Sequence, residues 1–159
     1  MIIAATGHRP NRLGGYDDEV LDKLTVLATE FLVDRRPNKV ITGMAQGWDT
    51  AIALAAIDLD IPLLTALPFE GQEKRWGQRD QNRYHSILEK AAEVVVVTSH
   101  IPSTYAFHRR NIWMVDHCDL LVALWDGEGG DASGTAQCVN YAWKVGKPII
   151  NLWGMWKKR

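Results

Sequence analysis

Short apolar runs alternate along the chain with longer stretches in which apolar residues recur every three or four positions. Apolar runs are typical of buried strands, and the wider spacing is typical of amphipathic helices. The runs predict strands at residues 1–6, 39–42, within 61–69, 94–97, 119–125 and 149–153. The amphipathic stretches predict helices at 17–34, from 49 or 50 to about 59, and at about 78–92, 109–117 and 134–145. The four valines at 94–97 indicate a strand that is buried on both faces.

The alternation of strands and helices with short connections predicts the fold class. We expect a three-layer α/β domain with a mainly parallel sheet and helices on both faces. One domain is expected at 1–153, followed by a basic tail at 154–159. Ligands of such sheets bind beyond the carboxyl ends of the strands, where the strand order reverses. Four loops therefore become candidates for a binding site: 7–16, 43–50, 68–76 and 126–135.

Composition narrows the functional classes without selecting one. Of the 159 residues, 47% are hydrophobic and 23% are charged, which is typical of a globular domain rather than a disordered chain. Lys plus Arg number 18 against 19 for Asp plus Glu, and a net charge of -1 gives no overall attraction to nucleic acid or membranes. The longest apolar run, at 51–57, is far shorter than a membrane span, and the first one is not followed by a signal-peptide pattern. We expect a cytoplasmic protein.

The histidines and cysteines give no sign of a metal or a cofactor. The two cysteines form no disulfide framework, and the five histidines lack the spacing of metal ligands. The first strand leads into Gly7-His8-Arg9 rather than a Gly-x-Gly-x-x-Gly turn, and no Walker A loop is present. We therefore expect no metal site and no cofactor of the nicotinamide type.

The strongest chemical signal is the glycine-rich loop at 126–135, between a predicted strand and a predicted helix. Glycines such as Gly130 and Gly134 let the backbone approach a ligand closely, and free amides at a helix start attract phosphate. Thr135 adds a hydroxyl donor. The sequence therefore predicts phosphate binding here. The alternative is a strand-to-helix turn that needs only the conformational freedom of glycine.

A second glycine-rich loop follows the second strand. Gly43, Met44 and Gly47 lead into Asp49, which places backbone amides and a carboxylate at another helix start. The loop is a candidate for phosphate or sugar binding. In the alternative interpretation, Asp49 only caps its own helix.

Three further groups complete the candidate site. Arg110 and Asn111 suit contacts with a phosphate and with a base or sugar edge, although a solvated pair is equally consistent with the sequence. Trp48 and Trp125 lie beside the predicted cleft, where they are candidates for stacking on a base. If the protein is an enzyme, its candidate catalytic carboxylates are Asp49, Asp126 and Glu128.

Taken together, the loops resemble the YpsA-like family of the Rossmann-like superfamily, which also contains the DNA-processing protein DprA and the Lonely Guy phosphoribohydrolases. The residues that carry the resemblance include Thr6-Gly7-His8-Arg9-Pro10, Gly43 to Asp49, Pro68-Phe69-Glu70-Gly71-Gln72, Arg110-Asn111 and Gly134-Thr135. The resemblance covers about residues 2–150. It implies a nucleotide-derived ligand with its phosphate near Gly134 and Thr135, and its sugar or base near Gly7, Gly43 and Asp49. His8 and Arg9 are also expected to contact the nucleotide or its phosphate.

Three functions follow from this interpretation. The preferred one is a sensor or binding protein for a nucleotide or nucleotide derivative. The first alternative is a nucleotide N-glycosidase resembling the phosphoribohydrolases, whose glutamates after the Gly-Thr turn are replaced here by Ala136-Gln137-Cys138. The second is a single-stranded DNA-binding module resembling DprA. We also expect a homodimer or a larger homo-oligomer, and no membrane partner.

Overall fold

The computed structural model describes residues 1–98, 103–129 and 133–159. Its six-stranded sheet has the strand order β4-β3-β2-β1-β5-β6, and every neighbouring pair is parallel. The strands are β1 (Ile2–Gly7), β2 (Lys39–Thr42), β3 (Leu63–Leu67), β4 (Glu93–Val96), β5 (Leu120–Leu124) and β6 (Ile149–Asn151). The helices are a 3-10 turn at Pro10–Arg12, α1 (Asp18–Arg35), α2 (Trp48–Asp58), α3 (Gln78–Lys90), α4 (Thr104–Asp116), α5 (Gly134–Lys144) and α6 (Trp153–Trp156). The predicted α/β Rossmann-like fold is confirmed.

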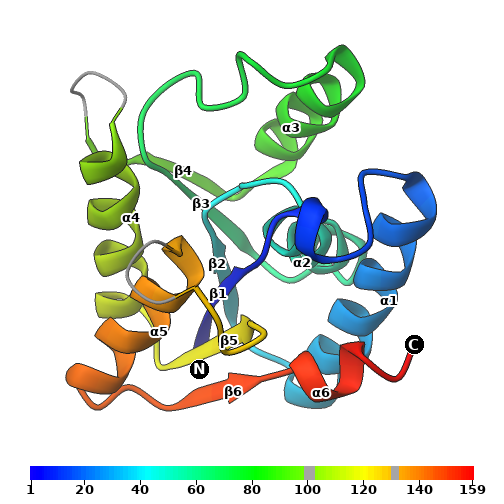
Figure 1. Cartoon of the computed structure of the whole chain (residues 1–159). Coiled ribbons are helices and arrows are strands. Elements are labelled where there is room, and N and C mark those ends of the chain that lie inside the picture. The colour runs from blue at the N-terminus through cyan, green and yellow to red at the C-terminus, as the bar shows by residue number, and fades with distance from the viewer. Residues whose placement is uncertain (99–102, 130–132) are drawn as a thin grey trace.

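The helices form two layers that enclose the sheet (Figure 1). Side chains alternate along a strand, so Ile3 of β1 faces one layer and Ala4 faces the other. The first layer contains α1, α2, α3 and α6, and it packs on a core that includes Leu24 and Ile52. The second layer is formed by α4 and α5, which pack on a separate core. Two hydrophobic cores therefore hold the sheet on both faces.

The side of the sheet on which successive strands are added switches at β1, in the centre of the sheet. The first four strands progress outward from β1, and β5 then returns to pair with β1 on its other side. The carboxyl ends of β1 and β5 are consequently the point where ligands bind in open parallel sheets. The loops after β1, β2 and β5 lie at this edge.

Three local predictions need correction. The strand at 93–96 is not buried on both faces: β4 is an edge strand, and Val94 and Val96 are 47% and 38% exposed. Helix α4 begins at Thr104 rather than near residue 109, because Ser103 caps it by accepting a hydrogen bond from the Ala106 amide. The last strand ends at Asn151 instead of residue 153.

The end of the chain folds back onto the first core. Residues 153–156 form α6, in which Trp153 and Trp156 pack against that core, and Arg159 forms an ion pair with Glu30. The predicted boundary after residue 153 thus falls at the start of a helix. Among the described residues, no helix is both long and apolar enough to cross a membrane.

Candidate functional site

A cleft of about 560 Å³ opens at the carboxyl ends of β1 and β5. We call it the main cleft. The predicted site residues that line it come from four separate segments: Gly7, His8, Arg9, Asp49, Arg110, Asn111, Gly134 and Thr135. The lining residues outside the predicted site are Thr6, Asn11, Arg12, Ala45, Thr104, Phe107, His108, Gly129 and Ser133. The fold therefore brings together residues that the sequence places far apart.

Asp49 is the acidic residue of the cleft wall, and it lies in the first turn of α2. The Ala45 amide donates a hydrogen bond of 3.2 Å to its Oδ2. Its Oδ1 is buried and has no hydrogen-bond partner among the described residues. Burial raises the pKa of Asp49 to about 6, although the nearby Arg110 and the Ala45 amide act to lower it. The carboxylate therefore has one oxygen without a partner among the described residues, and its pKa lies close to neutral pH.

Arg110 is a buried cation whose role is partly structural. Its Nη1 donates to the Gly43 carbonyl at 2.6 Å and to the Ala66 carbonyl at 3.3 Å, which ties α4 to the ends of β2 and β3. Its Nε donates to Oδ1 of Asn111. Asn111 in turn donates to the Gly134 carbonyl and to Gln137 on α5. The pair predicted from sequence thus shapes the cleft wall by linking α4 to β2, β3 and α5.

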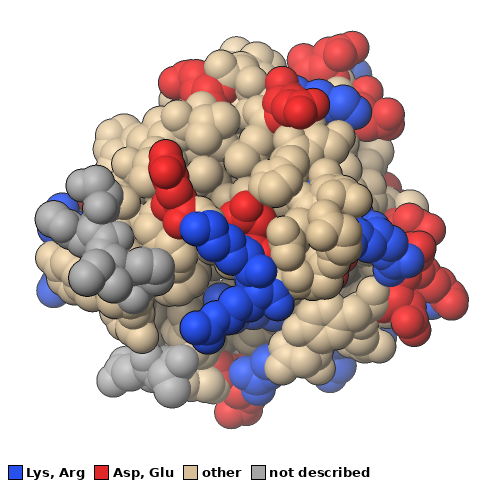
Figure 2. All heavy atoms as spheres, turned by 90° about the horizontal axis from the view of Figure 1, so that it is seen from above, with Lys and Arg blue, Asp and Glu red and all other residues tan. Residues whose placement is uncertain are grey.

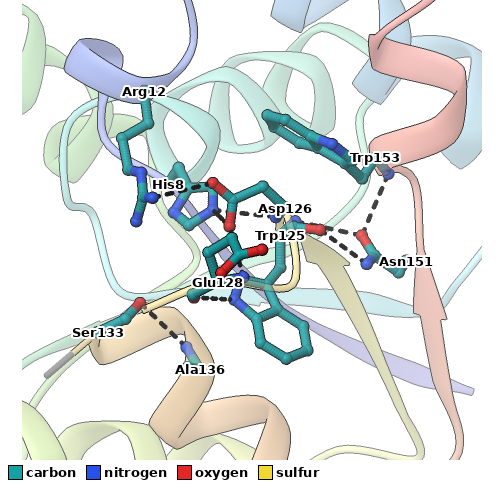
Figure 3. A network of polar contacts seen from close by, with 9 residues as sticks. All are labelled: His8, Arg12, Trp125, Asp126, Glu128, Ser133, Ala136, Asn151 and Trp153. Carbon is teal, nitrogen blue, oxygen red and sulfur yellow. Dashed lines mark hydrogen bonds and ion pairs between the residues drawn. The ribbon is translucent and has the colours of Figure 1, made fainter. Parts of the chain in front are cut away.

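His8, Arg12 and Asp126 form a polar network beside the cleft (Figure 3). His8 Nε2 lies 3.0 Å from the backbone nitrogen of Asp126, which donates to it, and 3.0 Å from the carboxylate Oδ1. Arg12 lies 3.1 Å from the other carboxylate oxygen. Burial lowers the pKa of His8, although the Asp126 carboxylate acts to raise it. Nε2 faces both the amide and the carboxylate of Asp126: it accepts from the amide when it carries no proton, and donates to the carboxylate when it carries one.

The Asp126 carboxylate is already engaged in holding its own loop. Burial acts to raise its pKa, but the Glu128 amide, His8 and Arg12 together lower it. The Glu128 amide donates to the Asp126 side chain at 2.8 Å, and the Trp125 indole donates to the Glu128 carbonyl at 2.8 Å. Asn151 accepts from the Trp125 amide and donates to its carbonyl. These contacts fix the start of the loop after β5 (Figure 3).

The start of α5 has the features of an anion site. Ser133 caps the helix by accepting from the Ala136 amide. The amides of Gly134 and Thr135 have no acceptor among the described residues, and both residues line the main cleft. The positive end of the helix dipole lies behind them. An anion placed here would satisfy donors that the protein leaves open.

The glycines predicted for the site differ in the reason why a side chain would not fit there. A Cβ on Gly7 would lie 2.6 Å from the Trp48 side chain, and a Cβ on Gly43 would lie 2.4 Å from Arg110. Gly47 has φ of +91°, and a Cβ there would lie 2.6 Å from the His8 carbonyl oxygen. Internal packing therefore explains these three. At Gly134, by contrast, no atom of the described residues lies within 4 Å of the added Cβ.

Several predicted residues lie outside the cleft wall. Gly43, Met44, Gly47, Asp126, Glu128, Trp48 and Trp125 are not among its lining residues. Trp48 is fully buried in the first core, so the prediction that its ring stacks on a base is wrong. Met44 is fully buried as well. The Trp125 ring packs on the second core and its indole nitrogen braces the loop. Gly130 lies outside the described residues.

The sequence interpretation missed Thr104, Phe107 and His108 on the face of α4 toward the cleft, and included only Asn111 of that face. Thr104, Phe107, His108 and Asn111 have the three-to-four residue spacing of one helical face, and all four line the cleft. Recognising Ser103 as a helix cap would have extended the predicted helix back to Thr104, and so to Phe107 and His108. Among the described residues, no group of three His, Cys, Asp or Glu side chains is placed to hold a metal ion.

Comparisons with known proteins agree with the resemblance seen in the loops. The YpsA family model, described as the YspA SLOG family, matches residues 3–150. The SPbeta prophage-derived protein YoqJ of Bacillus subtilis is 30% identical over 140 residues, which cover 78% of this chain and 80% of YoqJ. The UPF0398 protein YpsA of Bacillus subtilis is 28% identical over 139 residues, 80% of this chain and 77% of YpsA. The predicted family resemblance is confirmed.

Solved structures show the same fold at low sequence identity. DprA from Streptococcus pneumoniae aligns with a TM-score of 0.64 at 16% identity, over 92% of this chain and 48% of DprA. This chain therefore spans about half the length of that protein. DprA from Helicobacter pylori, studied for its single-stranded DNA binding mode, aligns with a TM-score of 0.64 at 18% identity, over 94% of this chain and 63% of that protein.

Proposed function

This chain belongs to the YspA SLOG family, and we propose that it binds a nucleotide or nucleotide derivative in the main cleft, as a sensor or binding protein. The observation that carries the proposal is the start of α5. Gly134 and Thr135 present amides to the cleft that have no acceptor among the described residues, and no described atom lies within 4 Å of a Cβ added at Gly134. A phosphate group matches these donors in charge and geometry.

The opposite requirement, an acceptor for a sugar, is supplied by Asp49. Its Oδ1 is buried in the cleft wall without a partner among the described residues. A buried acceptor without a partner is unfavourable, and a ribose hydroxyl that donates to it would relieve that cost. Arg9, which lines the same cleft and is exposed, adds positive charge beside the proposed phosphate site. The cleft thus offers a donor site for phosphate and an acceptor for sugar.

Calorimetric titration with a panel of nucleoside monophosphates tests the proposal. Gly134→Glu places bulk and negative charge in the phosphate site, so we expect binding to fall below detection. The melting temperature of the unliganded variant should change by only a few degrees, because no described atom occupies that space. Thr135→Val should weaken binding by about 1–2 kcal/mol through the loss of one hydroxyl contact.

Gly77→Glu is the matched control. Gly77 also has open space at its Cβ position, and it lies before α3, outside the lining of the main cleft. The control should bind like the wild-type protein. If Gly134→Glu keeps the wild-type affinity while the protein remains folded, the phosphate lies elsewhere and the proposal fails.

Hydrolysis of an N-glycosidic bond is a second candidate function, favoured by Asp49. A carboxylate with a pKa of about 6 and a free oxygen suits an activator of water or a stabiliser of positive charge on the sugar. Incubation with the same nucleotides, followed by chromatography for free base, tests it. Release of base that disappears in Asp49→Asn would support an enzyme, and intact nucleotide at long times would refute it.

Self-association remains a prediction for this family member. Trp143 of α5 is 67% exposed, an unusual position for a tryptophan without a partner surface. Light scattering at micromolar concentration should give a molar mass of at least two chains. A mass of one chain would refute it.

A further inference from the structure

A second pocket of about 690 Å³ adjoins the main cleft, and we call it the side pocket. The two share four lining residues, Arg9, Ala45, Thr104 and Phe107, so they form one continuous hollow. The rest of the side pocket is lined by the loop between β3 and α3, and by Gln46 and Ser103. Each of the two spaces falls within the range for a drug-sized ligand. Together they exceed what one mononucleotide needs.

The side pocket is positively charged. Arg9, Lys74 and Arg75 line it, and no Asp or Glu at the described positions does. Within the part of the chain that the structure describes, no carboxylate lies within 4.0 Å of these three cations, whereas Arg12 pairs with Asp126. The face seen in Figure 2, at the carboxyl edge of the sheet, gathers Lys and Arg side chains near its centre. Unpaired cations around a hollow favour an anionic ligand.

Aromatic rings provide flat apolar surface in the same pocket. Phe107 stands at the boundary with the main cleft, its ring edge-on to Phe69 at 5.4 Å, and the Arg9 guanidinium lies 5.8 Å from its centroid. Trp76 is half-buried, and Tyr84 supports it edge-on at 5.3 Å. Such rings stack on nucleobases, and the neighbouring cations match phosphate.

The loop that carries Lys74, Arg75 and Trp76 is held in place by hydrogen bonds from the side chains of Gln81 and Gln72. Gln81 of α3 donates to the carbonyls of Lys74 and Trp76. Gln72 donates to the Gly43 carbonyl at 3.0 Å, the same oxygen that accepts from Arg110. The cations and the indole therefore project from a braced loop that is linked to the wall of the main cleft, which favours a pre-formed site.

We propose that the side pocket binds the distal half of the same ligand, so that the ligand consists of two nucleoside units joined through phosphate. The proximal phosphate lies at the start of α5, and Arg9 at the boundary contacts the linking phosphate. Lys74 and Arg75 contact the distal half, whose base stacks on Trp76. This inference rests on the proposed function, because it extends the ligand of the main cleft.

Titration with matched probes tests the inference. For each of the common bases, the nucleoside monophosphate is compared with the pyrophosphate-linked dinucleotide that carries the same base twice. For the base that binds best, we expect the dinucleotide to bind on the order of 10-fold or more tightly than the monophosphate, because it adds charged contacts and a stacked base. The double variant Lys74→Ala/Arg75→Ala should lose that gain and keep the wild-type affinity for the monophosphate.

The control is Lys157→Ala/Lys158→Ala, which removes two charges from exposed tail residues that line neither pocket. It should retain the preference for the dinucleotide, which separates a local contact from a general effect of charge. Equal affinity of the wild-type protein for monophosphate and dinucleotide would overturn the side-pocket inference and leave the proposed function standing. If neither the monophosphates nor the dinucleotides bind, the side-pocket inference and the proposed function are both refuted.

Oligothymidylates of two and six nucleotides distinguish a polymer from a dinucleotide. If the bound ligand does not extend beyond the side pocket, the hexamer should bind no more tightly than the dimer after correction for the number of binding positions. An affinity that rises with length, and falls steeply with salt, would overturn the inference in favour of single-stranded DNA running through the pocket.

Discussion

Asp49 and Asp126 are the same residue type at the same edge of the sheet, yet the fold gives them opposite properties. Asp49 is buried with one oxygen left without a partner, and its pKa is raised to about 6. Asp126 is held by the Glu128 amide, His8 and Arg12, and its pKa is lowered. The difference shows that proximity to a cleft does not make a carboxylate available. Asp49, whose Oδ1 has no hydrogen-bond partner among the described residues, is the carboxylate that can accept a hydrogen bond from a ligand.

Removing the buried cation near Asp49 should have the largest effect. Arg110→Met removes the hydrogen bonds that Arg110 donates to the Gly43 and Ala66 carbonyls, and it leaves Arg9 as the remaining cation that acts on the Asp49 charge. We expect a loss of about 3–5 kcal/mol in the free energy of unfolding, measured by urea denaturation near pH 7.5. Arg12→Met is the matched control at Asp126; because the Arg12 side chain is 41% exposed, it should cost less than about 1 kcal/mol. If Arg110→Met and Arg12→Met lose equal free energy of unfolding, the proposed contrast between the surroundings of Asp49 and Asp126 is wrong.

Neutralising Asp49 should stabilise the unliganded protein. A carboxyl whose folded pKa is raised from 3.8 to about 6 contributes stability below pH 3.8, and that contribution is lost as the pH rises through 6. Asp49→Asn avoids the buried charge, so it should be more stable than the wild-type protein by up to about 3 kcal/mol above pH 7. The difference should shrink toward pH 4. Urea denaturation across this range measures it, and a variant that is less stable above pH 7 would contradict the assignment.

Asp126→Asn should change the free energy of unfolding in the opposite direction to Asp49→Asn, and by a smaller amount. A carboxyl with a lowered folded pKa contributes stability above its ordinary value near 3.8, and that stability is lost as the pH falls through the folded pKa. Asp126→Asn should therefore lower the free energy of unfolding by about 1 kcal/mol near pH 7, as expected for a weakened hydrogen-bond network. The two proteins should converge in acid. Thermal unfolding at pH 7 and at a pH well below 3.8 checks this, and a gain in stability at pH 7 would refute the bracing role of Asp126.

The sequence alone predicted most of the scaffold. Alternating apolar runs and amphipathic stretches fixed the order of strands and helices, because burial periodicity is a local property of the chain. The glycine-rich turns and the Arg110-Asn111 pair indicated where a ligand would be expected. The edge strand β4 was misread, because four successive valines look alike whether or not a neighbouring strand and helix cover them.

The tertiary structure decided which of the indicated groups remain available. Trp48 fills the space above Gly7, and Asp126 contacts His8 from 118 positions away, so both are occupied by partners that local sequence does not show. Gly134, Thr135 and Asp49 line one cleft with polar groups that have no partner in the described part of the chain. The physical reason is that a residue's type sets which hydrogen bonds it can form. Its neighbours in the folded chain, often distant in sequence, determine whether those bonds are already made.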